Sequence, residues 1–147
     1  MTTSSRAGLA LLKHFEGCRL QAYPDPATGG APWTIGYGRT TNVHRGDTCT
    51  QVQADTWVEQ EYDAFEARVR ALVHVELNAN QLGALVSFAY NVGAANLASS
   101  TLLRLVNAGR FDEVPAQFPR WNRAAGKIEP GLITRRATEA ALFRRAP

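Results

Sequence analysis

Hydrophobic residues recur at helical spacing over most of this 147-residue chain, with one interruption near the N-terminus. The first helical pattern can be capped by Ser4 or Ser5, because a serine hydroxyl accepts from the free N–H groups of a first turn. It can end at Gly17, because glycine tolerates the left-handed turn that follows many helices. Its apolar positions fall at steps of three and four and are Leu9, Leu11, Leu12 and Phe15.

The helical period disappears between Cys18 and Asp47, where glycine and proline are dense. Two short runs in this segment, Leu20–Tyr23 and Trp33–Tyr37, carry the apolar and aromatic residues that strands favour. The segment therefore predicts two short strands joined by a loop.

Capping boxes mark the start of the next two helices. Thr50 with Gln53 opens a long helix, and Asn78 with Gln81 opens a nearly all-apolar helix that stops around Gly93. The all-apolar pattern predicts a helix central to the core. The predicted buried stripe of the long helix is Val58, Tyr62, Phe65, Val69 and Leu72.

Further helices are expected from about Ser100 to Gly109, after Asp112, and from about Gly131 to Arg145. The whole pattern predicts an α+β fold, mainly α, in a single domain over residues 1–147. A small N-terminal β lobe and a larger helical lobe would be joined by the long helix, with a cleft between them.

Composition is typical of a globular protein, with 45% hydrophobic and 20% charged residues. No apolar stretch reaches the roughly 18–20 residues that cross a bilayer, so we expect no stable membrane insertion. The first residues lack the basic-then-apolar order of a secretory signal, so we expect the protein to begin in the cytoplasm.

The net charge of +3 is unevenly placed. From Arg120 to Pro147 there are seven basic residues against two acidic ones, net +5. A basic end suits an anionic partner such as nucleic acid, a membrane surface or a bacterial envelope polymer, and a solvated basic face is an equal alternative.

Other chemistries find little support in the sequence. The histidines are scattered and no metal-binding spacing occurs, so no metal or cofactor is expected. Cys18 and Cys49 form no metal or redox motif; buried free thiols are favoured, and a disulfide stays open as the alternative. No nucleophile elbow or phosphate-binding loop is present.

Two carboxylates stand out around the first helix end. Glu16 lies in the last turn, where unpaired carbonyls carry partial negative charge and should favour the protonated acid. Asp25 sits between two prolines in a polar turn, where a carboxylate should stay ionised or stabilise the turn. Cleavage of a glycosidic bond needs such a pair, one acid and one carboxylate.

The run from Glu16 through Asp25 to Trp33-Thr34-Ile35-Gly36-Tyr37-Gly38 resembles the Glu–Asp–Thr constellation of the phage lysozymes, the endolysins of glycoside hydrolase family 24. The loop from Asp25 to Thr34 is about three residues longer than the family usually has. The resemblance continues through most of the chain, in Gln81–Gly93, Thr101–Gly109, Arg120–Asn122 and Pro130–Arg136.

The resemblance implies a lysozyme-like fold and the catalytic residues Glu16, Asp25 and Thr34. Thr40, Tyr90 and Asn91 resemble residues that contact sugar in the cleft, although ordinary polar positions at helix or strand ends explain them equally well.

The implied function is hydrolysis of the β-1,4 bond between N-acetylmuramic acid and N-acetylglucosamine in peptidoglycan, by inversion. A monomer would act on the wall in the periplasm once a holin had opened the membrane, with no nucleic acid partner. Two alternatives stay open: a lytic transglycosylase on the same bond, and a non-catalytic protein that binds the envelope.

Overall fold

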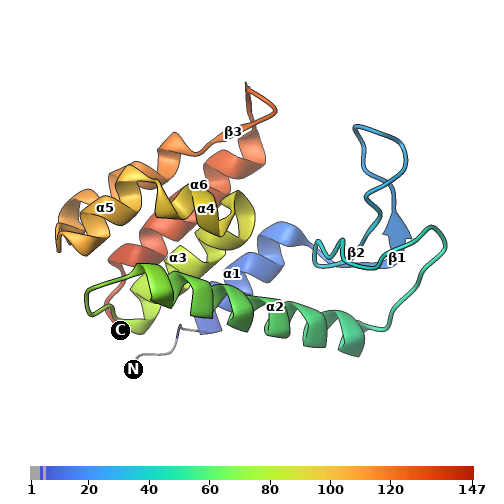
Figure 1. The fold of residues 1–147 in the computed structure, drawn as a ribbon, viewed down its shortest axis with the longest axis horizontal. Coiled ribbons are helices and arrows are strands. Elements are labelled where there is room, and N and C mark those ends of the chain that lie inside the picture. The colour runs from blue at the N-terminus through green and yellow to red at the C-terminus, as the bar shows by residue number, and fades with distance from the viewer. Residues whose placement is uncertain (1–3, 5) are drawn as a thin grey trace. The chain divides into compact units, whose positions relative to one another are not determined.

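The computed structural model describes residue 4 and residues 6–147. It consists of helices, the coiled ribbons in Figure 1, and two small two-stranded sheets. In chain order the elements are α1 (Arg6–Glu16), β1 (Arg19–Tyr23), β2 (Thr34–Gly36), α2 (Gln51–Leu72), α3 (Ala79–Val92), α4 (Ala94–Ala98), α5 (Thr101–Asn107), the 3-10 turns η1 (Phe111–Glu113) and η2 (Pro115–Arg120), β3 (Arg123–Ala124), β4 (Lys127–Ile128) and α6 (Pro130–Arg144).

These elements form two compact units. The larger, helical unit holds the described residues up to Leu12 together with residues 62–147, and the smaller unit holds residues 13–61 and the β1–β2 sheet. Helices α1 and α2 each supply residues to both units. The α+β class, mainly α, is confirmed; the cleft between the lobes stays a prediction.

The predicted strands are confirmed as an antiparallel pair in the smaller unit. Arg19 lies opposite Gly36 and Tyr23 lies opposite Thr34, so five residues of β1 face three of β2 across a bulge. A bulge of this kind bends the strand that carries it. A bridge from Gln21 to Thr48 adds the segment before α2 to its outer edge.

Both predicted capping boxes form. The Thr50 hydroxyl accepts from the Gln53 N–H at 3.1 Å, and the Gln53 amide oxygen accepts from the Thr50 N–H at 3.0 Å. Asn78 and Gln81 make the same reciprocal pair at the start of α3. These bonds satisfy N–H groups that a helix cannot pair internally, which explains why both helices begin where the sequence indicates.

The core of the larger unit is built on α3, where residues 82–89 are all buried. Helix α6 packs along it, and η2 packs on α6. The α2 stripe is confirmed at Val58, Tyr62 and Val69, whereas Phe65 and Leu72 are half-buried. A helix that is apolar nearly all round has to lie inside, so the sequence pattern and the position of α3 agree.

Four features differ from the sequence expectations. Helix α4 follows directly after Gly93, with no polar break to reveal it, and the β3–β4 hairpin has two-residue strands that are too short for a periodic signal. The segment after Asp112 forms 3-10 turns. Ser4, one of the two serines predicted to cap the first helix, donates its N–H to Glu66 Oε1 at 2.9 Å, and its hydroxyl donates to the same oxygen. Ser5, the other predicted cap, lies outside the described residues.

None of the helices in the described part of the chain is both long and apolar enough to cross a bilayer.

Candidate active site

Glu16 is the last residue of α1 and is half-buried. The helix stops there because Gly17 takes a left-handed conformation, with φ +67°, and its N–H donates to the Lys13 carbonyl at 3.0 Å. Gly38 lies against the acid: a methyl group built on its Cα would come within 3.0 Å of Glu16 Oε2. The turn after β2 is therefore one wall around this carboxyl group.

Asp25 is fixed by the turn that follows it. The Ala27 N–H donates to Asp25 Oδ1 at 2.7 Å, an Asx-type contact, and the Asp25 N–H donates to the Gly30 carbonyl at 2.9 Å. The Gly29 N–H donates to the Asp25 carbonyl at 2.8 Å, so the loop closes on itself. Asp25 therefore stabilises the turn, as one of the two sequence interpretations has it, and the same hydrogen bond restrains its carboxylate.

Thr34 begins β2 opposite Tyr23 and is half-buried. The loop before it is mainly exposed and projects beyond the strands, as the blue loop after β1 in Figure 1 shows. The turn between Asp25 and Gly30 lies before β2, and Thr34 pairs with Tyr23 in the sheet.

The short sheet orders these residues in space. Asp25 and Thr34 lie at the end where β1 stops and β2 starts, and Gly38, next to Glu16, follows the other end of β2. Two residue steps from Thr34 to Gly36 span about 7 Å of extended strand. All four residues belong to the smaller unit.

Thr40, Tyr90 and Asn91, the predicted sugar contacts, fall in different units. Thr40 is exposed and follows Arg39, whose guanidinium lies 4.7 Å from the Trp57 ring centre and 3.2 Å from the Glu61 carboxylate. This pairing holds the segment that carries Thr40.

The other two lie near the end of α3 in the larger unit. The half-buried Tyr90 ring packs on Phe65 with ring centres 5.2 Å apart. The exposed Asn91 uses its side-chain oxygen to accept a bond from Arg136, so this residue has a structural role as well.

Comparison with known proteins shows the family to which the chain belongs. The profile of the family described as phage lysozyme matches residues 13–139. The chain belongs to the phage lysozyme family.

Three relatives show how far the likeness extends. The endolysin of Bacillus phage PZA is 44% identical over 95% of this chain, which spans about half (54%) of that relative's length. The SAR-endolysin of bacteriophage PS119 is 34% identical over 84% of this chain and 73% of its own length. The solved muramidase domain of SpmX from Asticaccaulis excentricus is 37% identical, covers 99% of this chain and 100% of its own, and has a TM-score of 0.89. The fold of this family member is therefore lysozyme-like.

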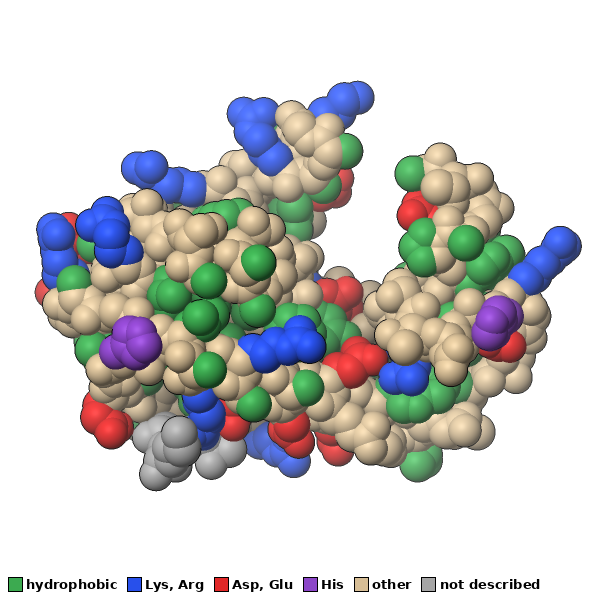
Figure 2. All heavy atoms as spheres, viewed as in Figure 1, with side chains coloured by type: hydrophobic (Ala, Val, Ile, Leu, Met, Phe, Trp, Pro, Cys, Tyr) green, Lys and Arg blue, Asp and Glu red, His purple; other side chains and the backbone are tan. Residues whose placement is uncertain are grey.

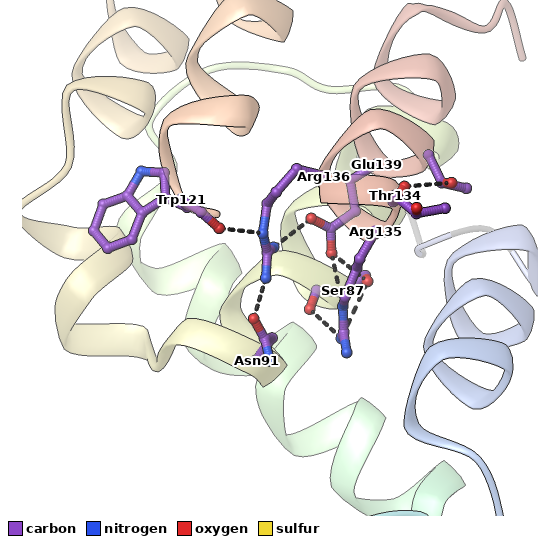
Figure 3. Close-up of polar contacts among 8 residues, drawn as sticks. Ser87, Asn91, Trp121, Thr134, Arg135, Arg136 and Glu139 are labelled. Atoms are coloured by element: carbon purple, nitrogen blue, oxygen red, sulfur yellow. Dashed lines mark hydrogen bonds and ion pairs between the residues drawn. The ribbon is translucent and has the colours of Figure 1, made fainter. Parts of the chain in front are cut away.

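A buried ion cluster anchors α6 to α3 (Figure 3). Glu139 pairs with Arg136, and its other oxygen lies 3.3 Å from Arg135 Nε and accepts from the Ser87 hydroxyl at 2.6 Å. Arg136 also donates to the Trp121 carbonyl at 3.0 Å and lies over the Phe88 ring. Burial raises the pKa of Glu139, and the two arginines and the hydroxyl oppose that rise.

The sequence did not indicate this cluster, since α6 carries no simple apolar stripe. Burial also corrects the charge analysis of the C-terminal end, because Arg135 and Arg136 face the core and add nothing to a basic surface. Exposed basic side chains remain on the β3–β4 hairpin, which projects at the top of Figure 2, namely Arg123 and Lys127. Arg144 and Arg145 are exposed at the end of α6.

Within residue 4 and residues 6–147, no group of three or more His, Cys, Asp or Glu side chains is placed to hold a metal ion. Cys18 and Cys49 are both free, as the favoured prediction has it, but they are half-buried rather than buried.

A second cluster, around Asp55, lies in the same unit as Glu16. Tyr37 donates its hydroxyl to Asp55 Oδ1 at 2.9 Å, and the Gln51 amide donates to the same oxygen at 3.1 Å. Lys13 Nζ lies 3.6 Å from that oxygen. The Tyr37 and Gln51 bonds, followed by the Lys13 charge, hold the pKa of Asp55 below its ordinary 3.8.

Proposed function

We propose that this chain is a muramidase of the endolysin type, hydrolysing the β-1,4 bond between N-acetylmuramic acid and N-acetylglucosamine in peptidoglycan. The observation that carries the proposal is the arrangement of three residues in the smaller unit. Glu16 ends α1 and lies against Gly38, while Asp25 and Thr34 lie at the end of the β1–β2 sheet where β1 stops and β2 starts. Membership of the phage lysozyme family supports it.

Glu16 would donate the proton that the departing sugar oxygen needs. It is the last residue of α1, is half-buried, and lies against Gly38, so its carboxyl group is held beside the turn that follows β2. Asp25, held by the Ala27 N–H, would polarise a water molecule and stabilise positive charge at the sugar carbon. Thr34 would help to hold that water.

The stereochemical outcome proposed is inversion. Inverting glycosidases keep their two carboxyl groups roughly 6.5–9.5 Å apart, which leaves room for a water molecule. The placement of Glu16 and Asp25 toward opposite ends of a three-residue strand supports a gap rather than direct attack. Proton NMR of the fresh product tests this: an initial α-anomer is expected, and an initial β-anomer would exclude inversion.

Substrate contacts at Thr40, Tyr90 and Asn91 are part of the proposal. Asn91 is the weakest member, because its oxygen already accepts a bond from Arg136. Asn91→Ala is therefore expected to lower thermal stability as well as substrate affinity, whereas Thr40→Ala, at an exposed position, should raise KM alone. A normal melting temperature for Asn91→Ala would show that the hydrogen bond from Arg136 to Asn91 does not stabilise the fold.

The biological setting proposed is host-cell lysis by a monomer in which residues 1–147 form one catalytic domain that needs no metal or cofactor. The enzyme would wait in the cytoplasm and reach the wall of the periplasm when a holin opens the membrane. Because one relative is named a SAR-endolysin, release without a holin is the competing outcome. Expression in cells with and without a holin gene decides between them, since lysis without holin would exclude the dependence.

The central test is Glu16→Gln, with Glu59→Gln as the matched control. Both remove one carboxylate from the smaller unit, but Glu59 is exposed on α2. We expect Glu16→Gln to lose about 10²–10⁴-fold in the rate of clearing permeabilised Gram-negative cells, because the amide cannot donate the proton. The control should retain full activity.

Three results would contradict the proposal. Near wild-type clearing by Glu16→Gln would remove Glu16 from the chemistry. Anhydro sugars in the mass spectrum of digested wall would indicate a lytic transglycosylase. Binding of wild-type protein to walls without any clearing would indicate a non-catalytic envelope protein.

A further inference from the structure

The Asp55 cluster joins three separate segments at one oxygen atom. Lys13 comes from the last turn of α1, three residues before Glu16, Tyr37 from the turn after β2, and Gln51 from the first turn of α2. The Gln51 amide also donates to the Tyr37 hydroxyl at 3.1 Å. A phenol shared between a carboxylate and an amide is held more firmly than one bond alone would hold it.

Tyr37 stands at the apex of a tight turn that faces Glu16. Reciprocal backbone bonds of 2.9 Å between Ile35 and Arg39 close the turn. Gly36 and Gly38, on either side of Tyr37, have φ +63° and +80°, and Gly38 is the residue that lies against Glu16 Oε2. These backbone bonds close the turn, but they do not connect its apex to α2. The Tyr37 hydroxyl makes that connection through its hydrogen bond to Asp55 of α2.

Resting on the proposed function, we propose that Tyr37 is a positioning residue for the acid: through Asp55 it holds the Gly36–Gly38 turn against the Glu16 carboxyl group. Thr34 begins β2 and Tyr37 directly follows the end of that strand, so the same bond also helps to fix where β2 ends relative to α2. Neither Tyr37 nor Asp55 touches the reacting atoms in this assignment.

The bond is suited to a permanent structural task. Burial and the Asp55 carboxylate raise the pKa of Tyr37 to about 12, so its hydroxyl keeps its proton at any pH where the enzyme works. Asp55 stays ionised in the same range because its pKa is lowered. Donor and acceptor therefore do not change with pH around neutrality.

Tyr37→Phe tests the inference, with Tyr23→Phe as the matched control from β1 of the same unit. The first variant removes only the hydroxyl that binds Asp55; Tyr23 stacks under Arg19 through its ring. We expect kcat to fall about tenfold with KM unchanged, since a small misplacement of a catalytic group is costly while sugar binding is untouched. The control should keep its kcat.

Asp55→Asn and the double variant show whether the two residues act together. Each single variant should lower kcat by a similar factor, and the double variant should fall no further, because both break one link. A kcat within twofold of wild type in Tyr37→Phe, or losses that multiply in the double variant, would overturn the inference.

An NMR measurement that needs no activity separates this inference from the proposed function. In the wild type, the Gly38 amide signal should move as Glu16 titrates and should lose that movement in Glu16→Gln. In Tyr37→Phe the movement should shrink, because the turn no longer rests on the carboxyl group. An undiminished movement would overturn the positioning role even if the protein proved unable to cleave peptidoglycan, and a reduced one would support it.

Discussion

Replacing Gly38 with alanine adds one methyl group beside the proposed catalytic acid. The new Cβ would lie 3.0 Å from Glu16 Oε2 and 3.7 Å from its carboxyl carbon. Contacts below 3.4 Å are tighter than almost all real Cβ contacts, so the carboxyl group would have to move by a few tenths of an ångström. This movement is possible because the atom that the new Cβ meets is the far end of a flexible side chain.

The backbone makes a separate contribution to the effect. Gly38 has φ +80°, a left-handed conformation that costs a residue with a Cβ about 1–2 kcal/mol. For a protein of this size, 1 kcal/mol lowers the melting temperature by about 2–4 °C, so the variant should melt about 2–8 °C below wild type. The displaced acid should cost about tenfold in kcat beyond that.

Gly46→Ala is the control that separates the two effects. Gly46 has φ +88° in the same unit, but a Cβ there meets nothing within 4 Å. Both variants should lose similar thermal stability in a calorimetric scan, and only Gly38→Ala should clear cell walls slowly. Equal activity of the two variants would refute the contact with Glu16, and an unchanged melting temperature in both would refute the strain estimate.

Three further changes probe the rest of the fold. Glu139→Ala leaves the buried guanidinium groups of Arg135 and Arg136 without their carboxylate, so urea denaturation should show a loss of about 3–5 kcal/mol; an unchanged midpoint would contradict this. Ala125→Gly should raise the melting temperature at equal activity, because Ala125 has φ +51°, and a lower one would count against strain. The pKa of Asp55 is lowered in the folded protein, so Asp55 stabilises the fold above pH 3.8, and this stabilisation is lost as the pH falls through the folded-state pKa. Asp55→Asn should therefore lose less melting temperature than the wild type when the pH is lowered. An equal loss in both proteins would show that Asp55 does not cause the acid-side loss of stability.

The sequence was most informative where structure depends on neighbouring residues. The capping boxes at Thr50 and Asn78 were readable because each involves residues three apart in the chain. The end of α1 could be predicted from Gly17 because a glycine in a left-handed conformation is also a local feature. Elements without a local signal were missed: α4 begins directly after the Gly93 that ends α3, and the β3–β4 hairpin is too short to show a period.

The same division applies to the candidate site. Glu16, Asp25 and Thr34, and the family motif around them, could be identified from the sequence. Residue types and the turns next to them are local properties of the chain. Only the tertiary structure brought Gly38 against Glu16, joined Tyr37 to Asp55 across 18 positions, and buried Arg136 against Glu139. These contacts depend on how α1, α2 and the β1–β2 sheet pack in one unit and α3 and α6 in the other, and packing between distant segments leaves no period or spacing in the chain that a sequence can display.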